Sequence, residues 1–90
     1  MKLRIRTLIG REFLIDHDFD NTVEHILHKL LEINNKNNQF VIYQKDIRLI
    51  LEGTELNIYN TLPINYNYLL TPIYLIITKN TNKNYYTEIL

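Results

Sequence analysis

Hydrophobic and polar residues alternate near the start of the chain, which predicts two neighbouring strands over residues 2–6 and 12–16. A period of two places successive side chains on opposite faces of a sheet. Gly10 tolerates the positive φ of a tight turn, so the two segments are expected to form an antiparallel hairpin. The apolar positions are Leu3, Ile5, Phe13 and Ile15, and the expected cross-strand charge pairs are Lys2 with Asp16 and Arg6 with Glu12.

The next segment has its hydrophobic residues at helical spacing. Residues 23–31 place apolar side chains three or four positions apart, which makes one stripe on a helix. Asn21 and Glu24 have the spacing of a capping box at the start of this helix. The helix is expected to end near Asn34 and Asn35, because asparagine favours the left-handed conformation of a helix C-cap. The stripe consists of Val23, Ile26, Leu27, Leu30 and Leu31.

Three later apolar runs predict strands over residues 40–43, 47–51 and 73–78. Gly53 predicts a turn after the second of them, and Leu56 a short strand after that turn. Both faces of the last strand are apolar. Ile73, Leu75 and Ile77 share one face, and Tyr74, Ile76 and Thr78 share the other.

The order of these elements predicts a single α+β domain over residues 1–78, followed by a frayed C-terminal tail over residues 79–90. One helix must cover the apolar side of a mixed sheet of four to five strands, because nothing else shields the first hairpin from water. The first and last strands then pair in parallel at the sheet centre. This arrangement is a β-grasp.

Composition argues against several classes of function. Ten basic and ten acidic residues cancel, so the chain lacks the clustered cations that nucleic acid or a membrane surface would require. The chain contains neither cysteine nor serine, and it has no glycine-rich phosphate loop. The longest mostly apolar run, residues 69–77, is too short for a bilayer, and the first residues lack a signal-peptide core. We therefore expect a cytoplasmic or nuclear protein without catalysis or cofactor.

Metal-ligating residue types are densest over residues 16–18, with Asp20 and His25 nearby. Neighbouring strand residues point to opposite faces, so this set is expected to be a solvated turn and not a metal site. His25 and His28 are expected on the exposed polar face of the helix.

The residues resemble ubiquitin. The opening MKLRIRTLIG, the run Arg48-Leu49-Ile50 with Gly53 and Leu56, the pair Thr61-Leu62 and the final strand occur in the order and spacing of that family, across residues 1–78. His17 replaces an apolar core position. The positions that match the family's core are Leu3, Ile5, Phe13, Ile15, Val23, Ile26, Leu30, Leu49, Leu56, Leu62, Ile73 and Leu75.

The resemblance also implies a protein-binding surface. Leu8, Ile50 and Ile76 match the exposed hydrophobic patch by which ubiquitin is recognised, Tyr74 replaces a histidine of that patch, and Arg48 matches an arginine at its edge. The implied partners are ubiquitin receptors or enzymes of the ubiquitin pathway. No glycine follows Gly53, so the Gly-Gly end that conjugation needs is missing, and a non-conjugating, non-catalytic interaction module is expected.

Three alternatives stay open from the sequence. The third strand can be formed by residues 41–43 in place of residues 47–51. The tail can fold over the patch through Tyr85, Tyr86, Ile89 and Leu90, which would leave no binding surface. The domain can also be a structural subunit that self-associates through residues 40–43 as an edge strand or through its Tyr-rich tail.

Overall fold

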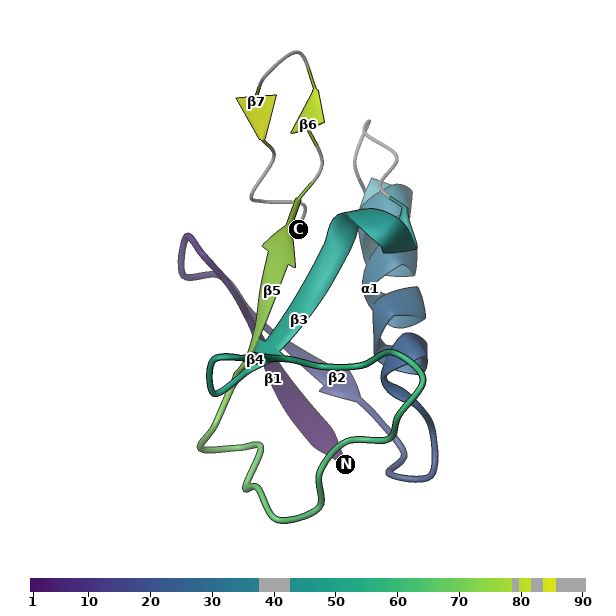
Figure 1. Cartoon of the computed structure of the whole chain (residues 1–90), viewed down its shortest axis with the longest axis vertical. Coiled ribbons are helices and arrows are strands. Elements are labelled where there is room, and N and C mark those ends of the chain that lie inside the picture. The colour runs from purple at the N-terminus through teal and green to yellow at the C-terminus, as the bar shows by residue number, and fades with distance from the viewer. Residues whose placement is uncertain (38–42, 79, 82–83, 86–90) are drawn as a thin grey trace.

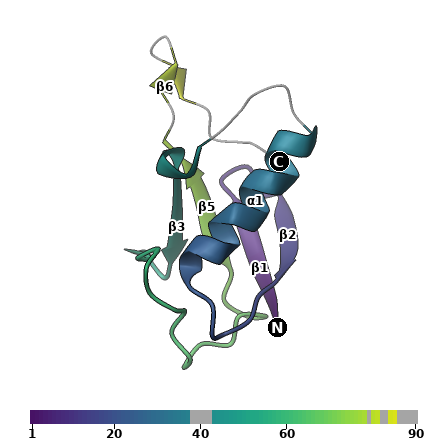
Figure 2. The same cartoon turned by 90° about the vertical axis from the view of Figure 1, so that its right-hand side faces the viewer.

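A computed structural model describes residues 1–37, 43–78, 80–81 and 84–85. The fold is α+β, with one helix packed against one face of a five-stranded mixed sheet (Figures 1 and 2). The sheet strands are β1 (Lys2–Thr7), β2 (Glu12–Asp16), β3 (Ile47–Leu51), β4 (Thr54–Glu55) and β5 (Ile73–Ile77). The helix is α1 (Val23–Asn37), a 3₁₀ helix η1 spans Gln44–Asp46, and β6 (Asn80–Thr81) pairs with β7 (Asn84–Tyr85).

The first hairpin has the predicted register. β1 and β2 are antiparallel, with Lys2 opposite Asp16 and Arg6 opposite Glu12. Gly10 has a φ of 92° in the connecting turn, which a residue without Cβ adopts at little cost. Alternation of charged and apolar residues therefore fixed both the pairing and its register.

The sheet order is β2-β1-β5-β3-β4. β1 and β5 pair in parallel at its centre, as predicted, and β3 pairs antiparallel with β5. Residues 47–51 are thus the third strand, and the alternative that gave this place to residues 41–43 is wrong. Residues 40–42 lie outside the described residues, and Tyr43 directly precedes the 3₁₀ helix.

Helix α1 begins at Val23, the first residue of the predicted stripe, but the predicted capping box and the predicted C-terminal end are both wrong. The helix runs to Asn37, past Asn34 and Asn35; Ile33 packs against the core there, which favours continuation of the helix. At its start, the amide of Asn21 donates to the carbonyl of Asp18 and not to Glu24. The Glu24 carboxylate instead accepts a hydrogen bond from Gln44 Nε2, at 3.0 Å.

The first turn of α1 is capped by a distant loop. The amides of Val23 and Glu24 donate to the carbonyls of Asn60 and Ile58, at 2.8 and 3.0 Å. These bonds satisfy helix amides that have no partner within the helix. They also fix the loop between β4 and β5 against the start of α1.

The core lies between α1 and the sheet. All the predicted core positions are buried except Phe13 and Leu56, which are partly buried. Tyr68 was not predicted; it comes from the loop between β4 and β5, and its hydroxyl donates to the Pro63 carbonyl at 2.6 Å. The buried apolar residues are Leu3, Ile5, Ile15, Val23, Ile26, Leu27, Leu30, Ile47, Leu49, Leu51, Leu62, Tyr68, Ile73, Leu75 and Ile77.

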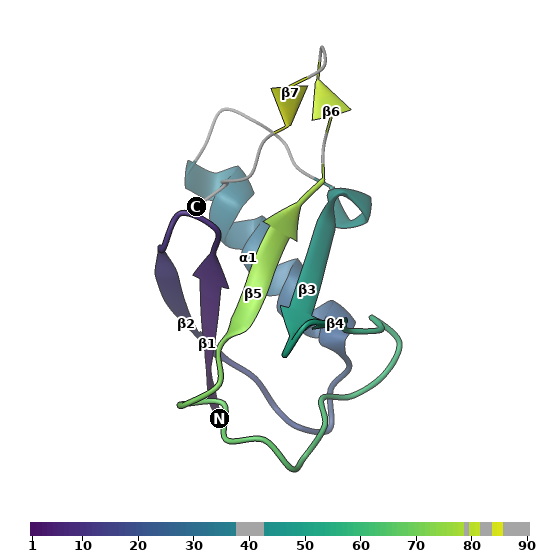
Figure 3. The same cartoon turned by 60° about the vertical axis from the view of Figure 1, so that its left-hand side comes forward.

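The tail was predicted to be frayed, yet its described residues form a small two-stranded sheet of β6 and β7. Figures 1 and 3 both show this pair beyond the end of β5, and not across a face of the larger sheet. Among the described residues, no helix has both the length and the apolar character needed to cross a bilayer.

Candidate interaction surface

The two central strands β3 and β5 have one buried and one outward face. In β3, Ile47, Leu49 and Leu51 are buried, and in β5, Ile73, Leu75 and Ile77 are buried. The residues between them point away from α1, toward the face that Figure 3 presents. The apolar positions of these strands are therefore divided between the core and the outer surface, as the sequence pattern predicted for β5.

Strand register places four of the five predicted binding residues together. Ile50 is opposite Tyr74, and Arg48 is opposite Ile76. Leu8 follows Thr7, the last residue of β1, which pairs with Leu75 of β5. We call Leu8, Arg48, Ile50, Tyr74 and Ile76 the sheet-face patch.

The members of the sheet-face patch differ in exposure. Leu8 is 55% exposed and Tyr74 is 36% exposed. Ile50 and Ile76 are half-buried, because side chains of adjacent strands cover their flanks. The exposed groups of the patch are therefore the Tyr74 ring and the Leu8 side chain, and the half-buried Ile50 and Ile76 lie in β3 and β5 beside Tyr74.

Ion pairs flank the patch on both sides. Arg6 Nη2 lies 3.0 Å from Glu12 Oε2, and Arg48 Nε lies 3.4 Å from Glu55 Oε2. Arg48 Nη1 also donates to the Lys45 carbonyl at 2.9 Å. Exposed pairs of this kind add little stability, but they hold the charged groups beside the apolar centre.

Glu12 is the most strongly perturbed group on this face. Hydrogen bonds from Arg4 and then Arg6 lower its pKa to about 2. The same contact with Glu12, followed by Tyr74, raises the pKa of Arg6. Glu12 is therefore ionised throughout the physiological pH range, and its carboxylate accepts hydrogen bonds from both Arg4 and Arg6.

The role of Arg4 was missed in the sequence. Besides its contact with Glu12, its Nη1 donates to the Leu69 carbonyl at 2.8 Å. This bond ties the first hairpin to the loop that leads into β5. The available signal was that Arg4 lies between Lys2 and Arg6 on the same face of β1, but the partner in the loop depends on the tertiary fold.

The alternative in which the tail covers the patch rests mostly on residues that the structure does not describe. Tyr86, Ile89 and Leu90 lie outside the described residues, and Tyr85 belongs to β7.

The remaining sequence candidates have structural surroundings of their own. The part of the chain that the structure describes contains no group of three or more His, Asp or Glu side chains able to hold a metal ion. His25 and His28 are exposed, as expected, and His28 Nε2 lies 3.1 Å from Gln44 Oε1. Residues 16–18 were expected in a solvated turn, but the His17 side chain is buried, and neither of its ring nitrogens has a hydrogen-bond partner among the described residues.

An apolar centre with charged margins is suited to protein recognition, since buried aromatic and aliphatic groups supply affinity and rim charges supply specificity. The patch meets that description with Tyr74 and two isoleucines at its centre and Arg48 at its edge. No protein-family model matches this sequence, and no curated protein matches it.

Proposed function

We propose that this chain is a non-catalytic, non-conjugating ubiquitin-like interaction module with a β-grasp fold, which binds a protein partner through the sheet-face patch. The sheet order, the parallel pairing of β1 with β5 and the single covering helix support the β-grasp assignment. The likeness to ubiquitin in the order and spacing of residues 1–78 supports the family.

The observation that carries the proposal is the division of β3 and β5 into two apolar faces. A strand needs only one apolar face to pack against α1. The second face, with Ile50 and Tyr74 opposite each other, does not contribute to that core. An apolar cluster kept at the surface is a common mark of a binding site.

The proposed partners are ubiquitin receptors or enzymes of the ubiquitin pathway, which places the protein inside the cell. Four of the five positions that match ubiquitin's recognition patch are neighbours in β3 and β5, with Arg48 opposite Ile76 and Ile50 opposite Tyr74. Tyr74 in place of a histidine adds a larger ring with a hydroxyl. We therefore expect overlap with ubiquitin's partners and altered selectivity among them.

The direct test is calorimetric titration of a ubiquitin-receptor domain with the full chain and with Ile50→Arg. Leu14→Arg is the matched control, because Leu14 is 62% exposed on β2 of the same sheet, outside the patch. The proposal expects binding by the wild type and by Leu14→Arg, with Ile50→Arg binding at least about tenfold more weakly, as for the loss of one hot-spot contact. Equal loss in both variants would refute the patch as the binding site.

A second candidate function is a self-associating structural subunit. It is favoured by β6 and β7, which among the described strands pair only with each other, because the edge of a small sheet can pair with a strand of another chain. Light scattering at tens of micromolar distinguishes the two functions. A concentration-dependent dimer that is lost when residues 79–90 are deleted supports self-association, and a monomer excludes it at that concentration.

A further inference from the structure

Three exposed leucines lie beside one arginine on the outer face of the sheet, near the start of β1. Leu14 of β2 is directly opposite Arg4 of β1. On the other side, Arg4 Nη1 donates to the Leu69 carbonyl at 2.8 Å, in the segment that turns into β5 beside β1 (Figure 3). Leu14, Leu69 and Leu70 are 62%, 57% and 76% exposed. We call Arg4, Leu14, Leu69 and Leu70 the leucine–arginine site, which shares no residue with the sheet-face patch.

The turn that carries Leu69 and Leu70 is closed by hydrogen bonds to one residue, Asn67. Asn67 Oδ1 accepts from the Leu69 amide at 3.1 Å. The Asn67 carbonyl accepts from the amides of Leu70 and Thr71 at 3.0 and 2.8 Å. Tyr68, inside the same turn, is buried in the core, so the turn directs its aromatic residue inward and holds both leucines in water. A segment whose backbone is fixed before binding loses less entropy when a partner arrives, which suits this turn to recognition.

Arg4 carries charge that its carboxylate partner does not fully balance. Glu12 accepts hydrogen bonds from Arg4 Nη2 at 3.1 Å and from Arg6 Nη2 at 3.0 Å, so two guanidinium groups share one carboxylate. A guanidinium has five N–H donors, and the bonds of Arg4 to Glu12 and Leu69 use three of them. Arg4 therefore has both the charge and the donors for a further acceptor.

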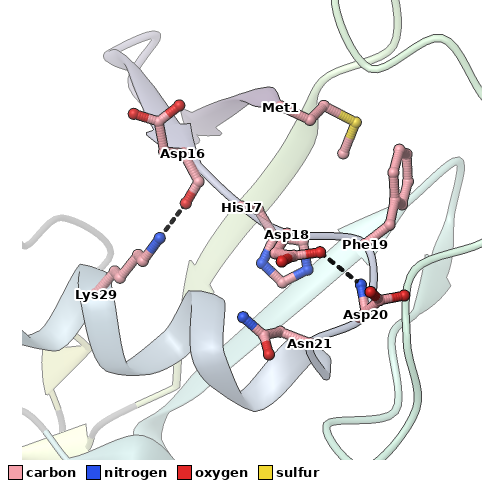
Figure 4. A pocket seen from close by; sticks show the side chains of 8 residues that line it. All are labelled: Met1, Asp16, His17, Asp18, Phe19, Asp20, Asn21 and Lys29. Atoms are coloured by element: carbon pink, nitrogen blue, oxygen red, sulfur yellow. Dashed lines mark hydrogen bonds between the residues drawn. The ribbon is translucent and has the colours of Figure 1, made fainter.

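The other carboxylate on the outer side of β2 does not supply the missing negative charge. The Asp16 carboxylate pairs with Lys2 at 2.9 Å, and the Asp16 backbone carbonyl accepts from Lys29 of α1 (Figure 4). The two strands of the first hairpin thus have three cations on β1 against two carboxylates on β2. The excess positive charge lies at the two arginines that share a carboxylate, Arg4 and Arg6.

These features match an acidic, apolar segment of another protein. A carboxylate complements the arginine charge, and apolar side chains cover the exposed leucines. A nucleic-acid phosphate would match the charge but leave the leucines in water. A purely apolar ligand would cover the Arg4 guanidinium without giving it an acceptor, which costs free energy. The charge and the leucines together therefore select one class of partner.

We propose that the leucine–arginine site binds a protein segment in which a carboxylate lies between apolar side chains. The carboxylate accepts hydrogen bonds from Arg4, and the apolar side chains pack against Leu14 on one side and Leu70 on the other. The site is separate from the sheet-face patch, so the two binding functions are tested, and can fail, independently.

The first test selects partners from a display library of random heptapeptides. The library is depleted on the Leu70→Ser chain, which removes peptides that bind elsewhere, and is then selected on the full wild-type chain. Leu70 is exposed in a turn that Asn67 closes, so Leu70→Ser is expected to fold. The proposal expects enriched peptides with Glu or Asp next to Leu, Ile or Phe. No enrichment, or enriched peptides without an acidic residue, would overturn it.

The second test measures the affinity of an enriched peptide by fluorescence anisotropy. Replacing its acidic residue by the corresponding amide should weaken binding to the wild type about tenfold, as for the loss of one charge-assisted hydrogen bond. The same replacement should have little effect on binding to Arg4→Gln, because the partner of the carboxylate is then absent. Arg4→Lys keeps the charge and should keep part of the preference for the acid. An equal effect of the replacement in the wild type and in Arg4→Gln would overturn the role of Arg4.

Two control variants test where the peptide binds. Ile64 is 84% exposed in the same loop between β4 and β5 but lies outside the leucine–arginine site, so Ile64→Ser should bind the peptide like the wild type. Ile50→Arg, in the sheet-face patch, should also bind it like the wild type. A loss in Ile64→Ser as large as the loss in Leu70→Ser, or a loss in Ile50→Arg, would place the peptide elsewhere and overturn the proposal.

Discussion

Leu49 and Ile50 are neighbours in β3 whose side chains point to opposite faces, so they make a matched test of the divided sheet. Leu49 is 2% exposed in the core, and Ile50 is half-buried on the outer face. Leu49→Ala removes buried carbons and leaves an enclosed cavity, which costs about 2–5 kcal/mol of unfolding free energy. Ile50→Ala removes carbons from a surface that stays open to water, so only the transfer contribution is lost, about 1–2 kcal/mol.

Arginine at the same position separates the two faces further. In Ile50→Arg the aliphatic part of the side chain covers the same sheet surface while the guanidinium stays in water. Position 50 is opposite Tyr74 on one side and Glu55 on the other, and both are favourable neighbours for a cation. We therefore expect Ile50→Arg to change the unfolding free energy by less than about 1 kcal/mol.

The assay is urea unfolding followed by circular dichroism, with the three variants and the wild type under one buffer. A domain of 90 residues is expected to have only about 5–13 kcal/mol of stability, so the loss in Leu49→Ala is a large and measurable part of it. The reasoning is refuted if Ile50→Arg is destabilised as much as Leu49→Ala, because Ile50 would then belong to the core.

Three further predictions concern single residues. Gly53 has a φ of 80° with nothing near its Cβ position, so Gly53→Ala should lower the unfolding free energy by about 1–2 kcal/mol through backbone strain alone, and an unchanged urea midpoint would contradict this. The pKa of Glu12 is about 2 in the fold, against an ordinary value of 4.5. The stabilising effect of the Glu12 carboxylate is therefore complete above pH 4.5 and is lost as the pH falls toward 2. Over that pH range, the melting temperature of Glu12→Gln should fall less than that of the wild type. Burial, with Lys29 acting in the same direction, lowers the pKa of His17 below 6.5, so the unfolded chain binds more protons and stability should fall as the pH drops below 6.5. His17→Leu should remove that dependence and gain about 1–3 kcal/mol at pH 7, and an unchanged pH profile would show that His17 does not titrate differently in the fold.

The elements with strong periodicity could be predicted from the sequence. In β1 and β2, alternation of charged and apolar residues determined both the strands and the pairing of Lys2 with Asp16. In β5, the same alternation separated Leu75 from Tyr74. These features depend on neighbours in the chain or across one hairpin, which is why a linear pattern contains them.

The features that were missed depend on distant groups. The start of α1 is capped by the carbonyls of Ile58 and Asn60, and no local pattern around Asn21 reports this. The burial of His17 follows from how α1 and the turn over residues 18–21 close around it. Asn35 is compatible both with a helix end and with a helix interior, so its identity alone did not decide where α1 ends.

The central claim is that β3 and β5 keep one set of isoleucines in the core and another set open to solvent. It is tested most directly by NMR of the full chain with labelled isoleucine methyl groups and a soluble gadolinium chelate. Ile47 and Ile77, each 2% exposed and opposite each other in the same two strands, are the internal controls. The account predicts that the methyl signals of Ile50 and Ile76 relax clearly faster than those of Ile47 and Ile77. Equal protection of all four would contradict it, because the outer face would then be covered by the protein's own chain.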